Sequence, residues 1–142
     1  MNQLKVFTTE EANRLIPRLT ELITQLRAKQ QEIVAKEVEI DTLELLYPGP
    51  QEGKFSRQVA PQVEIYNEWV NQFYTLIDEV HELGCFLKDA ESGLVDFYGL
   101  HEGRVVYLCW RLGEPEVGFW HEVGRGYKYR QPIFRDEKES SG

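Results

Sequence analysis

The stretch GRVVYLCWRLGEPEVGFWHEV, residues 103–123, predicts two antiparallel strands joined by a loop. On either side of Gly-Glu-Pro-Glu, apolar residues alternate with polar or aromatic ones. This is the two-residue period at which strand side chains point to opposite faces. Glycine and proline at 113–116 mark the loop. We expect this four-residue loop to pair Leu112 with Val117.

The alternation predicts a sheet with one apolar and one polar face. A second loop, at 100–103, is expected to pair Gly99 with Arg104. On this register the apolar face packs on helices and comprises Val95, Phe97, Val106, Leu108, Trp110, Leu112, Val117, Phe119, His121 and Val123. The opposite face comprises Asp96, Tyr98, Tyr107, Cys109, Arg111, Trp120 and Glu122. A one-residue slip would exchange the faces of a strand.

Helical periodicity precedes the strands. Residues 8–46 carry an apolar stripe at steps of three and four, opened by a Thr8–Glu11 capping box. Pro17 predicts a kink or a short separate first helix, since proline removes a backbone donor. Turn residues at 47–54 end this segment, and a second helix is predicted over 56–83. Gly84 follows as its C-terminal cap.

The fold class is therefore predicted as α+β, in one domain over residues 1–135. A long antiparallel helical hairpin, residues 8–84, precedes a three- to four-stranded antiparallel β-meander, residues 85–134. Pro132 limits the last segment to an edge strand. Residues 136–142 are charged and small, and are expected to be disordered.

Helix length favours a homodimer. A helix of about 30 residues is about 45 Å long, more than one small sheet can cover. The second helix carries a heptad seam, with Trp69 and Leu76 on a further flank, wider than one partner helix needs. A second copy would give a four-helix bundle. The alternative is a monomer whose helices are shorter and broken near Pro17 and Asp41.

Composition bounds the function classes. The 142 residues carry a net charge of −8, which argues against nucleic-acid and anionic-membrane partners. The N-terminus has no apolar signal segment, so a cytoplasmic protein is expected. Cys85 and Cys109 have no metal-ligand spacing and are expected to be reduced, packed thiols.

Seven residues form the candidate ligand-binding set: Asp96, Tyr107, Arg111, Glu114, Trp120, His121 and Glu122. His121, on the apolar face, is interpreted either as a core histidine satisfied by a carboxylate or carbonyl, or as a ligand or base. For the polar face, the alternative to ligand binding is that Arg111 simply forms a cross-strand ion pair with Asp96 or Glu122. No HExxH or Cys-x-x-Cys motif is present, and we predict no metal site and assign no cofactor.

The run FLKDAESGLVDFYGLHEGRVVYLCWRLGEPEVGFWHEVGRGYKYRQPI and the opening FTTEEANRLIPRL resemble a bacterial family catalogued as domain of unknown function 2203. The likeness covers nearly the whole chain, and departs at Tyr98, where the pattern has proline. It implies no activity. Its polar motif positions fall on Lys88, Asp89, Asp96, Arg104, Glu114, His121, Glu122 and Arg130.

Two function classes remain open from the sequence. The first is a homodimeric interaction or small-ligand-binding module. The second is a metal- or ligand-dependent enzyme with a site around His121, Glu114 and Asp96. Whether the protein is an enzyme stays open at this level.

Overall fold

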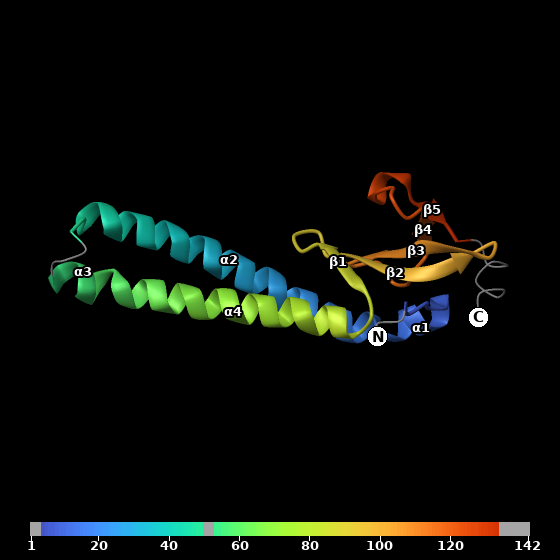
Figure 1. Cartoon of the computed structure of the whole chain (residues 1–142), viewed down its shortest axis with the longest axis horizontal. Helices are drawn as coiled ribbons and strands as arrows, with labels where there is room; N and C mark the ends of the chain where they lie inside the picture. Colours follow the sequence, from blue (N-terminus) through green and yellow to red (C-terminus); the bar gives the residue numbers. More distant parts are fainter. Residues whose placement is uncertain (1–3, 50–52, 134–142) are drawn as a thin grey trace. The chain divides into compact units, whose positions relative to one another are not determined.

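The structure, a computed structural model, describes residues 4–49 and 53–133 and is α+β. Helices occupy the N-terminal half, and an antiparallel five-strand sheet follows (Figure 1). The chain forms two compact units, Met1–Ile23 with Asp78–Gly142, and Thr24–Ile77. The disordered tail predicted at 136–142 lies outside the described residues. Among the described residues, no helix has both the length and the apolarity to cross a bilayer.

The first helical segment divides at Leu15, as Pro17 predicts. Helix α1 spans Thr9–Arg14, and the Thr8–Glu11 capping box is present in both directions. Helix α2 spans Ile16–Leu46. Pro17 is its second residue, where a backbone N–H would have no helical acceptor, so the proline removes no hydrogen bond. The alternative of a short separate first helix is therefore confirmed.

The second helical segment also divides, where one helix was predicted over 56–83. Helix α3 spans Gly53–Gln58 and α4 spans Ala60–Glu82, with the buried Val59 between them. Pro61 is the second residue of α4 and lacks an N–H that could donate to the carbonyl of Arg57, so the hydrogen bonds of α3 do not continue into α4. Gly84 caps α4 with φ +98°, and its N–H donates to the carbonyl of His81 at 2.9 Å.

Within Thr24–Ile77, α2 and α4 run side by side (Figure 1). The ammonium groups of Lys29 and Lys36 lie 5.1 and 5.2 Å from the centre of the Trp69 ring. Lys36 also donates to the side-chain oxygen of Gln62 at 2.7 Å. Because the Trp69 flank is covered by these two cations, it does not require a second copy to shield it.

The sheet has the sequential order β1-β2-β3-β4-β5 and is antiparallel throughout. Its strands are β1 Phe86–Asp89, β2 Leu94–His101, β3 Arg104–Arg111, β4 Phe119–His121 and β5 Gln131–Pro132. A 3-10 turn, η1 Tyr127–Tyr129, precedes β5. Pro132 lies in the edge strand, as expected for a residue that cannot donate to a ladder. The meander has more strands than the three or four predicted.

The turn between β2 and β3 is shorter than predicted. His101 pairs with Arg104, so the loop is the two residues Glu102 and Gly103, with φ of 51° and 81°. Two consecutive positive φ values give the turn whose twist matches that of the flanking strands. The predicted pairing of Gly99 with Arg104 is wrong by two residues. An even shift leaves every side chain of β2 and β3 on its predicted face.

The pairing of β3 with β4 differs from the prediction by one residue. Cys109 pairs with Phe119, where Trp110 was expected. Leu112 does not pair with Val117. Its N–H donates to the carbonyl of Gly93 at 2.9 Å, and the Val117 N–H donates to Oδ1 of Asn13 at 2.6 Å. These contacts lengthen the loop and exchange the faces of β4, so the predicted inward position of His121 is wrong.

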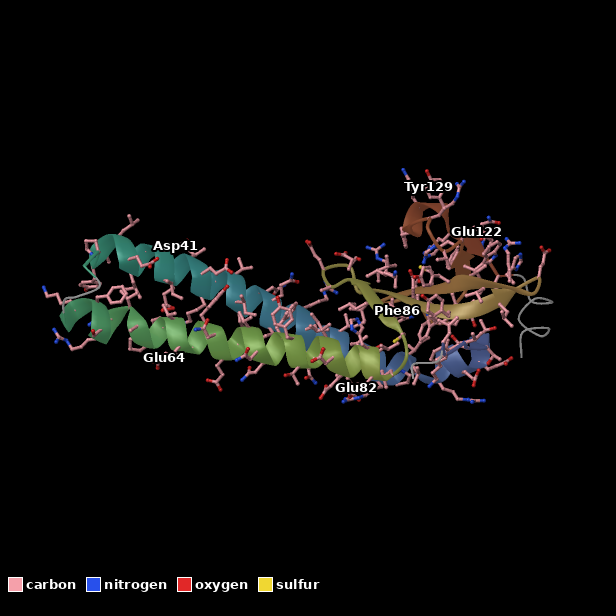
Figure 2. All side chains as sticks on the ribbon, in the orientation of Figure 1. Asp41, Glu64, Glu82, Phe86, Glu122 and Tyr129 are labelled. Carbon is pink, nitrogen blue, oxygen red and sulfur yellow. The ribbon has the colours of Figure 1, made fainter. Side chains whose placement is uncertain are left out.

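Trp120 takes the place on the apolar face that was predicted for His121. It is 6% exposed, and the valines, Phe97, Leu108 and Trp110 of β2 and β3 on this face are buried as predicted. Phe7 packs edge-on against Phe97, with ring centres 5.1 Å apart, and its N–H donates to the carbonyl of Tyr98. Helix α1 lies on this side of the sheet, and η1 with Tyr129 lies on the other (Figures 1 and 2). The polar face, which carries Asp96 and Cys109, is therefore the one on the side of η1.

Candidate functional site

Asp96 of β2 and His121 of β4 meet on the polar face of the sheet. Both are almost fully buried, at 2% and 3% exposure. His121 Nε2 lies 3.1 Å from one Asp96 carboxylate oxygen and 3.2 Å from the other. The two strands flank β3, and the residues pair in register with Cys109 and Tyr107 between them. The one-residue slip of β4 is what brings the imidazole to this face.

Both ring nitrogens of His121 face oxygen acceptors. Nδ1 lies 3.0 Å from the backbone carbonyl of Glu122, and Nε2 faces the Asp96 carboxylate. A carbonyl accepts only, so Nδ1 carries a proton. Neutral imidazole then has a lone pair on Nε2, which would repel a carboxylate. One positive charge or proton must therefore lie between Nε2 and Asp96, on either group. Both ring nitrogens of His121 thus have oxygen partners, a carboxylate and a carbonyl, on the polar face of the sheet and not on the apolar face where the residue was predicted.

Cys109 of β3 completes a three-residue cluster with Asp96 and His121. One potential ligand atom from each of the three lies within 4.8 Å of the others, and all three residues are buried. Burial raises the pKa of the Cys109 thiol to about 12, and the Asp96 charge adds to this effect. Burial also raises the pKa of Asp96, against the opposing effects of His121, Lys88 and a hydrogen bond from Cys109. Both cysteines of the chain are free and buried, as predicted.

A second pair of residues supports the cluster from the side. Arg130 donates to both carboxylate oxygens of Glu114, at 3.1 and 2.6 Å, and to Sγ of Cys109 at 3.8 Å. Its guanidinium stacks 3.8 Å from the centre of the Phe119 ring. The Arg111 N–H donates to Glu114 Oε1 at 2.8 Å, which fixes the loop after β3. Glu114 therefore holds the arginine that contacts Cys109.

A cavity of about 330 Å³ opens above the cluster. Asp96 and His121 form its buried floor, and the half-buried Tyr107 forms a wall. The exposed Lys88 lies at the rim, with Nζ 3.3 Å from the Tyr107 hydroxyl and 4.4 Å from the ring centre. The remaining lining residues are Leu94, Gly124, Arg125, Gly126 and Tyr127. The cavity thus joins β1, β2, β3 and β4 with the loop before η1.

Of the seven predicted site residues, three line the cavity: Asp96, Tyr107 and His121. Glu114 lies beside the cluster through Arg130, and the Arg111 guanidinium lies 5.9 Å from the Tyr127 ring centre. The structure places the other two elsewhere. Trp120 is on the apolar face, stacked on His101 with ring centres 3.9 Å apart. Glu122 forms an ion pair with Arg104 instead of Arg111.

Three residues of the candidate site were not in the predicted set: Cys109, Lys88 and Arg125. Cys109 lies two residues after Tyr107 on β3, so strand parity places it on the polar face with Asp96 and could have added it to the set. Lys88 lies on β1, whose pairing to β2 contains a bulge between Leu87 and Asp89. No periodic signal in the sequence indicates that the loop carrying Arg125 returns over the sheet.

The fold and the site define an α+β protein whose antiparallel sheet carries a buried Asp–Cys–His cluster beneath a small cavity. The family model of an uncharacterized conserved protein, DUF2203, matches residues 5–133, and the chain belongs to that family. This confirms the resemblance found in the sequence motifs. Neither the curated proteins nor the solved structures contain a match to the chain.

Proposed function

We propose that this protein is a small-ligand-binding module that takes a compact anionic molecule into the cavity above Asp96 and His121. The volume of about 330 Å³ is at the lower end of the range typical for small-molecule sites. The observation that carries the proposal is the combination of a buried polar floor with two cations, Lys88 and Arg125, in the lining.

The charges of the cavity favour an anion. The Asp96 carboxylate at the floor is compensated, since a proton lies between it and Nε2 of His121. Lys88 and Arg125 are exposed and remain available to a ligand, although the chain as a whole carries −8. A local positive site in an acidic protein selects small anions and discourages extended polyanions, which would meet the surrounding negative charge.

The same geometry argues against the alternative of an enzyme whose site is formed by His121, Glu114 and Asp96. A general base needs a free nitrogen within hydrogen-bond reach of the substrate. Both nitrogens of His121 are engaged, by Glu122 and by Asp96. Both oxygens of Glu114 accept from Arg130. These engagements favour binding over acid–base catalysis by these side chains.

Titration of isotope-labelled protein with inorganic phosphate, followed by NMR, tests the proposal. We expect shifts concentrated on β4 and residues 124–127. Lys88→Gln and Arg125→Gln should each weaken binding about tenfold, the usual contribution of a charged hydrogen bond. Lys128→Gln is the matched control, since Lys128 lies over the Tyr129 ring as Arg125 does but is not among the residues that line the cavity. Equal weakening by Lys128→Gln, or no binding of phosphate by the wild-type protein, would refute the proposal.

As a second candidate function, we propose assembly with a second copy through α2, with α2 and α4 acting as a helical hairpin. Val34, Val38 and Leu45 are 54%, 62% and 83% exposed. Steps of four and seven residues put all three on one helix face. In a dimer with two-fold symmetry, the same stripe of the second copy would face this one. Each stripe would then bury the apolar residues of the other.

A further inference from the structure

We propose that Asp96, Cys109 and His121 bind a transition-metal ion of the zinc class at the floor of the cavity. The inference deepens the proposed function, since it rests on the same cavity and gives the bound anion a metal to contact. It stands on the geometry of the cluster and does not require that an anion binds.

The three side chains offer one oxygen, one sulfur and one nitrogen from three adjacent strands, all within 4.8 Å of one another. Ligand atoms at about 2.0–2.3 Å from a tetrahedral ion are separated by about 3.3–3.6 Å. The Nε2–Oδ2 distance of 3.1 Å is close to this value. Since β2, β3 and β4 are held in register by ladder hydrogen bonds, small side-chain movements suffice to form the site.

The surroundings of His121 are those of a metal ligand. Nδ1–H donates to the Glu122 carbonyl, which directs the Nε2 lone pair toward Asp96 and Cys109. Metal-ligating histidines usually donate their second N–H to a carbonyl or carboxylate in this manner, which fixes the ring tautomer. The positive charge needed between Nε2 and the carboxylate can be supplied by a cation in place of the proton.

The surroundings of Cys109 favour a thiolate on metal binding. Arg130 donates to Sγ at 3.8 Å, and this charge would stabilise the sulfur anion. The bidentate contact with Glu114 holds the guanidinium in place. A metal would displace one proton from the thiol and one from the His121–Asp96 pair, so binding releases two protons to solvent.

The ligand types select the class of metal. A thiolate and an imidazole favour Zn²⁺ or Co²⁺ over Mg²⁺ and Ca²⁺, which prefer sites made of oxygen atoms alone. Three protein ligands leave one tetrahedral position open, the pattern of zinc sites that also bind water or a small anion. Asp96 and His121 line the cavity, so the open position would be reached from there.

Cobalt substitution tests the site directly, because a thiolate bound to Co²⁺ gives a sulfur-to-metal charge-transfer band. We expect the wild-type protein to bind one Co²⁺ per chain with this band. Cys109→Ser should abolish the band, and His121→Gln should abolish tight binding. Cys85→Ser is the matched control and should retain both, since Cys85 is the other cysteine of the chain and contacts the Val80 carbonyl instead.

A wild-type measurement keeps the test decisive if Cys109→Ser does not fold. X-ray absorption of the zinc-loaded protein should show one sulfur ligand with nitrogen and oxygen atoms. Absence of stoichiometric binding, absence of a sulfur ligand, or a band that persists in folded Cys109→Ser would overturn the proposal. Lys88→Gln separates the two proposals, since it should retain the Co²⁺ band while it weakens phosphate binding.

Discussion

At the residue scale, the buried Asp96–His121 pair is held in place by neighbours rather than by its own attraction. Removing two charged groups from water costs several kcal/mol, which their attraction offsets only when the remaining hydrogen bonds are made. Here the Glu122 carbonyl accepts from Nδ1 of His121, and the Cys109 thiol lies within 4.8 Å of the Asp96 carboxylate and lowers its pKa. Every buried side-chain nitrogen and oxygen of the described residues has a partner, so the pair needs no metal to be compatible with folding.

Replacing one member of the pair should therefore lower the free energy of unfolding more than replacing both. His121→Leu leaves the Asp96 carboxylate buried without its main partner, and should lower the free energy of unfolding by about 3–5 kcal/mol. The double variant Asp96→Leu, His121→Leu removes both groups and should recover at least half of that loss. Urea unfolding followed by circular dichroism measures both values. A double variant less stable than His121→Leu would show that the pair is not coupled.

The buried thiol of Cys85 predicts alkaline sensitivity. Burial raises its pKa from 9.0 to about 12. Between these pH values the folded chain keeps the thiol proton that the unfolded chain loses. The contribution of the protonated thiol to the free energy of unfolding is therefore complete below pH 9 and disappears as pH rises toward 12. Wild-type protein should lose stability over this range, and Cys85→Ala should lose less of it. Urea unfolding at pH values below and above 9 tests this, and equal pH dependence of both proteins would contradict it.

At the element scale, α2 and α4 are joined by an aromatic ring between two cations. Lys29 and Lys36 are seven residues apart on α2 and both lie over Trp69 of α4. The heptad pattern of the second helix predicted a seam with Trp69 on a further flank. It did not indicate that Lys29 and Lys36 would cover that flank, because the pattern of one helix does not specify which side chains of another helix face it. In the structure the two lysine side chains are only 18% and 11% exposed, with their ammonium groups over the ring.

Replacement of this ring should destabilise the helical unit. Trp69→Leu removes two cation–π contacts of about 0.5–1 kcal/mol each, and should lower the free energy of unfolding by at least about 1 kcal/mol. Lys29→Met should lower the free energy of unfolding of the wild-type protein and leave that of the Trp69→Leu variant nearly unchanged. Urea unfolding of the four proteins forms a double-mutant cycle. An equal effect of Lys29→Met in both backgrounds would mean that the ring and the lysine do not interact.

At the scale of the whole molecule, the exposed stripe on α2 raises the question of assembly. A homodimer was predicted from helix length and stays a prediction. Val34, Val38 and Leu45 are apolar and more than half exposed, which is the type of surface that a second copy would cover.

Sedimentation equilibrium measures the mass of the assembly. A dimer of the 16.6 kDa chain is expected, and Val38→Lys with Leu45→Lys should convert it to a monomer of unchanged helicity. Leu100→Lys is the control, since Leu100 is an exposed apolar residue of the sheet, at 48% exposure. A wild-type monomer at all concentrations, or dissociation caused equally by Leu100→Lys, would exclude assembly through α2.

The sequence by itself determined those features of the helices and strands that depend on residues close together in the chain. The capping box at Thr8, the break before Pro17, the cap at Gly84 and the alternation along β2 and β3 all depend on neighbours within a few residues. The buried residues of β2 and β3 could be predicted for the same reason. The family motifs also belong to this level, since they are read directly from the chain.

The tertiary structure alone decided the register of β4, and with it the site. That register depends on the Val117 N–H donating to Asn13, 104 residues away, and on Leu112 donating to Gly93. No local pattern encodes such contacts. Since side chains on a strand alternate, a shift of one residue moved Trp120 into the core and turned His121 toward Asp96 and Cys109.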